Sequence, residues 1–237
     1  MAREGAEARR EEVARRAVDL NADVGEGFDA DAGLFAVITS ANVACGFHAG
    51  DEHTMRGACV AAAGVALGAH VSYRDRDGFG RRELGLDAAT VEAETAEQIA
   101  LLQEISGGRV AYVKPHGALY HRASHDDACA AAVVAAAAPL AVLGFPGSRL
   151  LARARAAGLV AVEEGFADRG YAADGSLVPR EEAGALLTED EAVAHAVALA
   201  ARVRSLCVHS DTPGAVALAS RVRAALEQAG IEVRAFV

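Results

Sequence analysis

The chain has 237 residues, of which 52% are hydrophobic and 24% are charged, and its formal net charge is −10. This length is enough to bury a large core, and the acidic balance argues against non-specific nucleic-acid binding, which needs a basic surface. No apolar run approaches the roughly 18 residues of a membrane span. The four cysteines form no C-x-x-C pair, so we predict neither a disulfide framework nor a structural zinc site.

The first 16 residues differ from the rest of the chain. They are mostly Ala, Arg and Glu and contain no apolar signal core. We predict that residues 1–16 form a disordered or loosely helical extension, and that residues 17–237 form a single catalytic domain. We expect a cytoplasmic protein that binds neither nucleic acid nor a membrane.

Short apolar runs alternate with alanine-rich helical segments along residues 17–237. Strands are predicted over 18–24, 35–38, 65–70, 110–113, 140–143, 159–162, 205–208 and 231–236, and helices over 52–63, 87–105, 126–138, 148–157, 189–203 and 215–229. The polar segment 174–180 is predicted to be a lid or a hairpin. The alternation predicts one parallel α/β domain, and seven or eight units in this length fit a (β/α) barrel. A doubly wound open sheet is the alternative.

The stretch from Ser40 to Asp51 carries Asn42, His48 and Asp51 on a glycine-bearing turn between a predicted strand and a predicted helix. Parallel α/β proteins place their chemistry at such carboxyl ends of strands. Asp51 also suits a helix N-cap. Cys45 with His48 as its base is a possible nucleophile, although a small buried cysteine is the commoner case.

Other polar side chains follow further strand ends. Four of the eight histidines lie there, namely His48, His70, His116 and His209, together with Asp19, Asp23, Glu26, Asp51, Asp168 and Asp211. Alternation places Asp19, Asn21 and Asp23 on one face of the first strand, where buried carboxylates are costly unless they bind something. We therefore predict a convergent active site. Histidine and carboxylate can hold a divalent metal or act without one as acids and bases, and the spacing does not choose between them.

Lysine and asparagine are rare in this chain. Lys114 is the only lysine among 23 basic residues, and Asn21 and Asn42 are the only asparagines. These three positions are candidates for sites where only that side chain works, because arginine cannot replace lysine as a compact charge. Lys114, Arg81, Arg82 and Arg169 are the cations available for a carboxylate or a phosphate. No Walker A motif and no G-x-S-x-G motif is present.

The chain from about Val18 onward resembles a known family, LamB/YcsF, to which one component of the prokaryotic ATP-dependent 5-oxoprolinase belongs. The resemblance is carried by several stretches in the same order, namely 19–26, 40–51, 68–72, 79–81, 113–120, 163–171, 174–180 and 207–209. It departs from the family at Ser210, where glycine is usual, and in a shorter segment before Ser205. Residues 1–16 have no counterpart.

The resemblance implies a seven-stranded, distorted (β/α) barrel of the glycosidase and deacetylase type. It implies cleavage of the lactam of 5-oxo-L-proline to L-glutamate with ATP as co-substrate, together with the partner 5-oxoprolinase subunits B and C. A divalent metal stays open. Our catalytic candidates are Asp23, His48, His70, Lys114 and His116, and our substrate-binding candidates are Asn21, Glu26, Asn42, Asp51, Arg81, Asp168, Arg169 and His209.

Three alternatives remain at this stage. A metal-dependent amidohydrolase or sugar deacetylase would act without ATP or partners. A non-catalytic protein would bind the lactam for a partner. A structural protein is hard to reconcile with acids on buried strands.

Overall fold

The computed structural model describes residues 17–173, 175–180, 182–212 and 214–237. The predicted extension 1–16 lies outside the described residues. The strands are β1 (Ala17–Val24), β2 (Ser40–Ala44), β3 (Ala66–Val71), β4 (Val110–Pro115), β5 (Ala141–Gly144), β6 (Ala161–Phe166), β7 (Ser205–Val208) and β8 (Glu232–Val233). The helices are α2 (Asp31–Leu34), α3 (Glu52–Ala61), α4 (Ala88–Ser106), α5 (Gly117–His125), α6 (Asp127–Ala137), α7 (Arg149–Ala156), α8 (Glu189–Leu199) and α9 (Ala215–Gln228).

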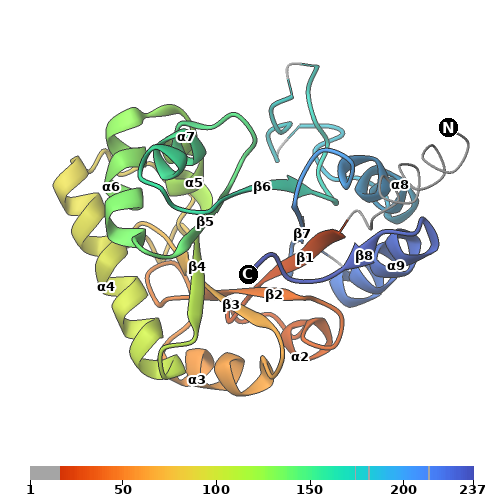
Figure 1. Ribbon diagram of the computed structural model, residues 1–237, viewed down its shortest axis with the longest axis horizontal. Helices are drawn as coiled ribbons and strands as arrows, with labels where there is room; N and C mark the ends of the chain where they lie inside the picture. The colour runs from red at the N-terminus through yellow and green to blue at the C-terminus, as the bar shows by residue number, and fades with distance from the viewer. Residues whose placement is uncertain (1–16, 174, 181, 213) are drawn as a thin grey trace, which may run out of the picture.

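The strands form a closed parallel barrel. Their order is β2-β3-β4-β5-β6-β7-β1, and β1 pairs with β2 as well as with β7, so seven strands complete the ring. Strand β8 pairs only with the first two residues of β1. The helices lie outside the ring (Figure 1). The predicted seven-stranded barrel is therefore confirmed, and the open sheet is excluded.

Most of the apolar core lies between the strands and the surrounding helices. It contains outward-facing strand residues such as Leu20, Val43 and Val113, packed against helix residues such as Leu102 and Val133. Parallel strands covered by helices bury both faces in this way.

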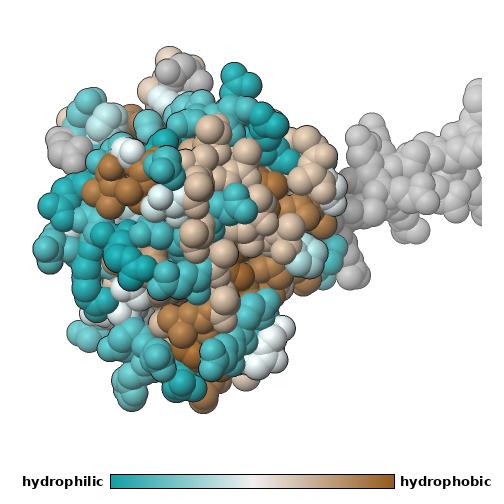
Figure 2. Space-filling view, turned by 90° about the vertical axis from the view of Figure 1, so that its left-hand side faces the viewer, coloured by the Kyte–Doolittle hydropathy of each residue, from teal (hydrophilic) through white to brown (hydrophobic). Residues whose placement is uncertain are grey.

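Within the described part of the chain, no helix is both long and apolar enough to cross a membrane. On the face in Figure 2, weakly hydrophobic surface and several strongly hydrophobic patches lie among hydrophilic side chains.

The barrel interior differs from this core because it is largely polar. Asp19 accepts hydrogen bonds from the hydroxyl groups of Thr39, Ser40 and Ser205. Above this layer, Asn42 Nδ2 donates to Asn21 Oδ1 at 2.7 Å. Burial raises the pKa of Asp19 to about 6, although its three hydroxyl donors oppose the shift. The alternating acids of β1 thus point inward, and hydrogen bonds satisfy them.

A small apolar cluster lies at the end of the barrel where the strands have their amino termini. Tyr112, Ala141, Leu143 and Val162 form a second small core, and Phe236 packs against it with its ring centroid 5.0 Å from that of Tyr112. Figure 1 shows the C-terminus near the middle of the ring. The charged cavity described below lies at the other end, where the strands have their carboxyl termini.

Gly68 has no side chain and so leaves room for the ring of Tyr112 inside the barrel, which makes a substitution there a test of the packing. A Cβ at Gly68 would lie 2.1 Å from Tyr112 Cε2. We expect Gly68→Ala to lower the free energy of unfolding by about 3 kcal/mol through overpacking. Gly57→Ala is the matched control. Gly57 is exposed on α3, and no atom lies within 4 Å of its added Cβ. Urea unfolding should show a lower free energy of unfolding for Gly68→Ala and one that is higher by up to about 1 kcal/mol for Gly57→Ala. Equal free energies of unfolding in the two variants would contradict the packing described.

Three sequence predictions need correction. Residues 35–38 are not a strand, because α2 ends in turns whose bonds run from Val37 N and Ile38 N to Leu34 O, and the strand is instead β2. Residues 163 and 164 lie within β6 rather than after it. Helix α5 is an additional element directly after β4.

Helix α5 begins at a glycine, which is why the sequence did not predict this helix. Gly117 has a φ of +54°, and a Cβ there would lie 2.4 Å from Gly80 O. A glycine that follows Pro115 is typical of a turn, so the helical residues beyond it are easily missed. The close approach of residue 80 brings the loop after β3 against the start of α5.

The segment after β6 is hairpin-like. Isolated antiparallel bridges join Arg169 to Leu186 and Tyr171 to Leu177, and Val178 N donates to Gly170 O at 3.0 Å. Of the two forms predicted for segment 174–180, a lid or a hairpin, these contacts agree with the hairpin. Residue 174 itself lies outside the described residues.

Candidate active site

A cavity of about 140 Å³ lies at the carboxyl ends of the strands. Its lining is mostly charged or aromatic, namely Asp23, Glu26, His70, Arg81, Lys114, Pro115, His116, Gly117, Tyr120, Phe166, Arg169, Leu177, Arg180, His209 and Asp211. These residues come from β1, β3, β4, β6 and the segments that follow the strands. The barrel thus brings together polar groups that are far apart in the chain.

Lys114 lies at the base of this cavity and is 2% exposed. Its Nζ lies 3.1 Å from Asp23 Oδ1 and 2.9 Å from Glu164 Oε1. Burial alone would lower the pKa of Lys114, but Asp23, the Cys207 thiol and Glu164 together hold it well above its usual value. Lys114 is therefore a fixed positive charge inside the barrel.

Asp23 is the partner of Lys114 that faces the cavity. Its Oδ1 also accepts a hydrogen bond from Asn42 Nδ2 at 2.8 Å. Burial opposes the negative charge of Asp23, but His70 and Lys114 lie close enough to hold its pKa well below the usual range. Asp23 is therefore ionised and suited to electrostatic stabilisation and orientation.

His209 and Asp168 form a second charged pair. His209 Nδ1 donates to Asp168 Oδ1 at 2.9 Å, and Asp168 also accepts from the Thr212 hydroxyl at 2.6 Å. Burial would lower the pKa of His209, but Asp168 raises it above its usual value. Burial would raise the pKa of Asp168, but His209 and Thr212 lower it to about 2. Since Nδ1 is engaged, Nε2 is the nitrogen of His209 available to a ligand in the cavity.

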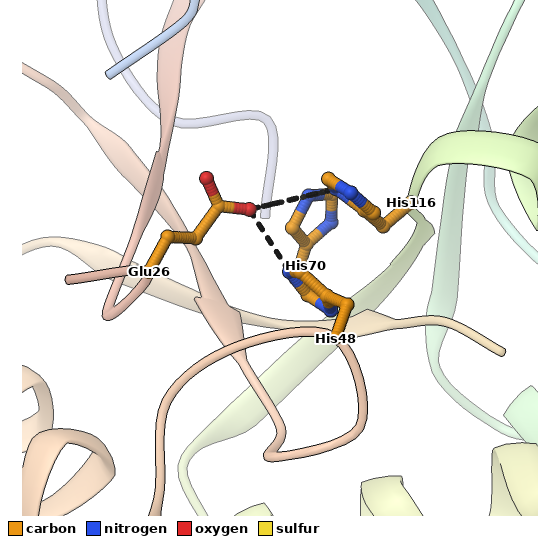
Figure 3. Close-up of side chains that lie close together, drawn as sticks. All are labelled: Glu26, His48, His70 and His116. Atoms are coloured by element: carbon orange, nitrogen blue, oxygen red, sulfur yellow. Dashed lines mark hydrogen bonds and ion pairs between the residues drawn. The ribbon is translucent and has the colours of Figure 1, made fainter. Parts of the chain in front are cut away.

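A third group joins one carboxylate to three histidines. Glu26, His48, His70 and His116 each direct one ligand-type atom inward, and these atoms all lie within 4.8 Å of one another. Figure 3 shows the four side chains converging from different strand ends. This cluster is one of two groups of described residues that could hold a metal ion, and the other is Asp23, Cys207 and His209.

Burial disfavours the charged forms of His48, His116 and Glu26 in the cluster. Burial lowers the pKa of His48 to about 4. Burial, reinforced by the neighbouring His48 and His70, lowers the pKa of His116 well below its usual value. Burial raises the pKa of Glu26 to about 7, and the charge of Asp23 adds to the shift.

Arginines surround the mouth of the cavity. Arg81 and Arg180 both pair with Asp211 Oδ2, at 2.7 and 3.0 Å. Arg169 has a structural role, because its Nε and Nη2 donate to the carbonyl oxygens of Ala185 and Val178. The first two arginines are thus the mouth cations best placed for an anionic substrate.

Five of the predicted site residues do not line the cavity, but two of these bind residues that do. His48 Nε2 lies 2.9 Å from Glu26 Oε1, and Asp168 binds His209 as described above. His48 and Asp168 therefore belong to the site through their contacts with Glu26 and His209, which line the cavity.

The other three are Asn21, Asn42 and Asp51. Both asparagines are fully buried beneath Asp23. Asn21 donates to Glu164 and accepts from Lys114, and Asn42 donates to Asn21 and to Asp23. Asp51 is exposed and caps α3 through a reciprocal hydrogen-bond pair with residue 54. The N-cap alternative therefore describes Asp51, and we leave it out of the site.

Asp51→Ala separates this cap from the cavity. We expect the free energy of unfolding to fall by about 1 kcal/mol, because the N-cap side chain is lost, while turnover stays at the wild-type level. Chemical denaturation and steady-state kinetics on the same preparation measure both. A loss of turnover beyond that explained by unfolded protein would return Asp51 to the site.

Cys45 is not arranged as a nucleophile. It is 1% exposed, and burial raises the pKa of its thiol to about 12. The hydroxyl of Ser72, rather than Cys45, binds His48 Nδ1 at 2.9 Å.

Sequence reasoning missed three residues of this region as site candidates. They are Glu164, which pairs with Lys114, and Tyr120 and Arg180, which line the cavity. Glu164 lies in the stretch 163–171, and Tyr120 and Arg180 end the stretches 113–120 and 174–180. Their place in those polar stretches was the available signal.

The fold and the site together define a class: a closed, seven-stranded (β/α) barrel with a charged, histidine-rich site at the carboxyl ends of its strands. The family model for LamB/YcsF matches residues 18–237, and the chain belongs to the LamB/YcsF family. This confirms the resemblance predicted from the sequence motifs.

Several named relatives share most of the chain. The A subunit of 5-oxoprolinase from Streptomyces griseus is 56% identical over 92% of this chain and 99% of its own length. The protein of the same name from Nocardia farcinica is 48% identical over 93% and 99%. The lactam utilization protein from Thermus thermophilus is 38% identical and superposes with a TM-score of 0.85 over 93% of this chain and 100% of its own.

More distant structures share only the fold. A family 4 carbohydrate esterase from Streptomyces lividans is 13% identical, with a TM-score of 0.54 over 93% of both chains. This likeness agrees with the predicted deacetylase-type barrel.

Proposed function

We propose that this chain is the component of an ATP-dependent 5-oxoprolinase that holds 5-oxo-L-proline while its lactam is opened to L-glutamate. The names of the relatives support this activity. The observation that carries it is the cavity itself, which is lined by a buried lysine and by a histidine that Asp168 holds from behind. Residues 17–237 are the catalytic domain in this proposal.

The reaction needs help because a lactam is an unactivated amide. Water adds to the carbonyl carbon, the C–N bond breaks, and the ring nitrogen leaves as an amine that takes up a proton. We propose that ATP first phosphorylates the lactam oxygen and leaves as ADP. Water then adds to the activated carbon and the C–N bond breaks, which leaves a free amine and an acyl phosphate. A second water hydrolyses the acyl phosphate, so that the coupled products are ADP, phosphate and L-glutamate. The protein must then stabilise negative charge at oxygen and deliver a proton to nitrogen.

The charged groups of the cavity match these two needs. Lys114 keeps its positive charge and offsets the charge that develops on the oxygen. His209, which Asp168 holds in its protonated form, donates from Nε2 to the leaving nitrogen. Asp23 orients Lys114, and the two buried asparagines support this pair from below. Arg81 binds the substrate carboxylate at the mouth.

We assign ATP binding to the complex with subunits B and C rather than to this chain alone. No Walker A motif occurs in the sequence. The arginines beside Asp211 lie where phosphate groups held by a partner would reach the cavity. An ATP-coupled reaction of this kind belongs in the cytoplasm.

Turnover with and without the other components tests the proposal. We expect the purified chain alone to form no L-glutamate from 5-oxo-L-proline, and the chain with ATP and subunits B and C to form one L-glutamate for each ATP hydrolysed. Activity of the complex that does not depend on this chain would refute a catalytic role. Binding of the lactam without any effect of cavity substitutions on chemistry would instead support a carrier role.

A metal-dependent hydrolase that acts alone is the second candidate. The cluster of Glu26 with three histidines favours it. It predicts amide or ester hydrolysis by the isolated chain without ATP, which the same assay would detect.

A further inference from the structure

The three histidines of the cluster have their outward nitrogens occupied by acceptors. His70 Nδ1 lies 3.1 Å from Lys114 O, and His116 Nε2 lies 2.9 Å from Phe79 O. A backbone carbonyl oxygen can only accept a hydrogen bond, so each of these nitrogens carries the proton. In the neutral rings, His70 Nε2 and His116 Nδ1 therefore present lone pairs, and these two atoms lie 3.0 Å apart.

His48 is held in the same way. The hydroxyl of Ser72 donates to Tyr73 O at 3.0 Å, so its oxygen accepts from His48 Nδ1 at 2.9 Å. His48 Nε2 then presents a lone pair to Glu26 Oε1, which is 2.9 Å away. Gln98 fixes Ser72 in turn, through hydrogen bonds to both its backbone N and its backbone O.

When the three rings are neutral, four acceptor atoms thus converge, and a fifth acceptor, Asp23 Oδ1, lies 3.4 Å from His70 Nε2. Two protons would be needed to satisfy the two close pairs, one between His70 and His116 and one between His48 and Glu26. A single divalent cation would satisfy all four atoms at once. The arrangement also matches that of metal-bound histidines, which donate their second ring N–H to a carbonyl or another acceptor.

Four distances between the inward atoms lie near those around a small tetrahedral ion. The rings of His48 and His116 stack in nearly parallel planes with their centroids 3.9 Å apart, so one of these rings must turn when an ion binds. Glu26 Oε1 lies 2.9, 3.5 and 3.8 Å from the inward nitrogens of His48, His116 and His70, and the last two nitrogens are 3.0 Å apart. Ligands at about 2.0–2.1 Å from a tetrahedral Zn²⁺ lie about 3.3 Å from one another. Mg²⁺ and Ca²⁺ prefer oxygen ligands, whereas imidazole suits Zn²⁺ and similar transition metals.

We propose that Glu26, His48, His70 and His116 form a binding site for one divalent transition-metal ion of the Zn²⁺ or Co²⁺ type. The site does not depend on the identity of the substrate. Three of its four residues, Glu26, His70 and His116, also line the cavity. A bound ion would therefore face the ligand, where such ions polarise a carbonyl oxygen or lower the pKa of a bound water.

Titration of the isolated, chelator-treated chain with Co²⁺ and with Zn²⁺ tests the proposal without any turnover assay. We expect one ion per chain, with the intense visible absorption of four-coordinate Co²⁺ that Zn²⁺ abolishes. His116→Ala and Glu26→Gln should each weaken binding at least about 100-fold, and Ser72→Ala about 10- to 100-fold because the hydrogen bond that orients His48 is lost. Circular dichroism checks that each variant is folded.

His121→Ala is the matched control, because His121 lies on α5 close in sequence to His116 but outside the cluster. It should bind both ions like the wild type. No stoichiometric binding by the wild-type chain up to millimolar ion, or binding that a folded Glu26→Gln or His116→Ala variant retains, would overturn the site and would mean that protons satisfy the cluster. Neither result would bear on lactam cleavage, which is measured separately.

Discussion

Lys114→Met is expected to reduce the turnover of 5-oxo-L-proline by the reconstituted complex by about 10³-fold. The buried ammonium is the charge nearest the point where negative charge develops, and removing such a donor costs about this much. The same change leaves Asp23 and Glu164 buried without their cation, so we also expect a loss of about 3–5 kcal/mol in the free energy of unfolding. Glutamate formation and urea unfolding measure the two effects.

A second substitution separates chemistry from folding. Lys114→Met combined with Glu164→Gln removes one of the orphaned charges, so stability should recover in part while turnover stays low. Arg149→Met is the matched control, because it removes an exposed cation from α7 and should change neither quantity. A double variant that regains near wild-type turnover would show that Lys114 serves only to compensate Glu164.

His209→Gln is expected to reduce kcat by about 10²- to 10⁴-fold, the range for loss of a general acid. Activity that needs protonated His209 should fall as the pH rises through its raised pKa. The variant should lack this alkaline limb. Asp168→Asn should shift the limb of the pH–rate profile to lower pH, because the carboxylate that raises the pKa of His209 is gone. An unchanged profile in both variants would remove the pair from the mechanism.

The same pair makes stability depend on pH. Because the folded pKa of His209 lies above its unfolded value, the stabilisation by protonation is complete below the unfolded pKa of about 6.5 and is lost as the pH rises through the folded pKa. We therefore expect the difference in unfolding free energy between the wild type and His209→Gln to be larger at about pH 6 than at about pH 9. Urea denaturation at the two pH values measures it.

Much of the barrel could be predicted from the sequence because its signals are local. The alternation of apolar runs with alanine-rich helices predicted the parallel barrel, and the polar residues at strand ends predicted where the cavity lies. The single lysine is the clearest case. Composition marked Lys114 as a candidate for a position where only lysine works, and the structure places it in a buried position between two carboxylates.

What the sequence missed depends on contacts across the barrel. Glu164 looks like a residue beyond a strand until β6 is seen to continue through it and turn it toward Lys114. Asp51 has the same residue type and strand-end position as Asp168, yet one caps an exposed helix and the other holds His209. Pairing of ring nitrogens with particular carbonyl groups is likewise invisible in sequence, since it depends on side-chain direction.

Opening of the lactam in the cavity of this chain is the central claim. The most direct test is a structure of the complex with subunits B and C, 5-oxo-L-proline and a non-hydrolysable ATP analogue. We predict that the lactam lies in this cavity, with its carbonyl oxygen toward Lys114 and its ring nitrogen toward His209 Nε2. A lactam bound wholly within one of the partners, with this cavity free of substrate, would contradict that claim.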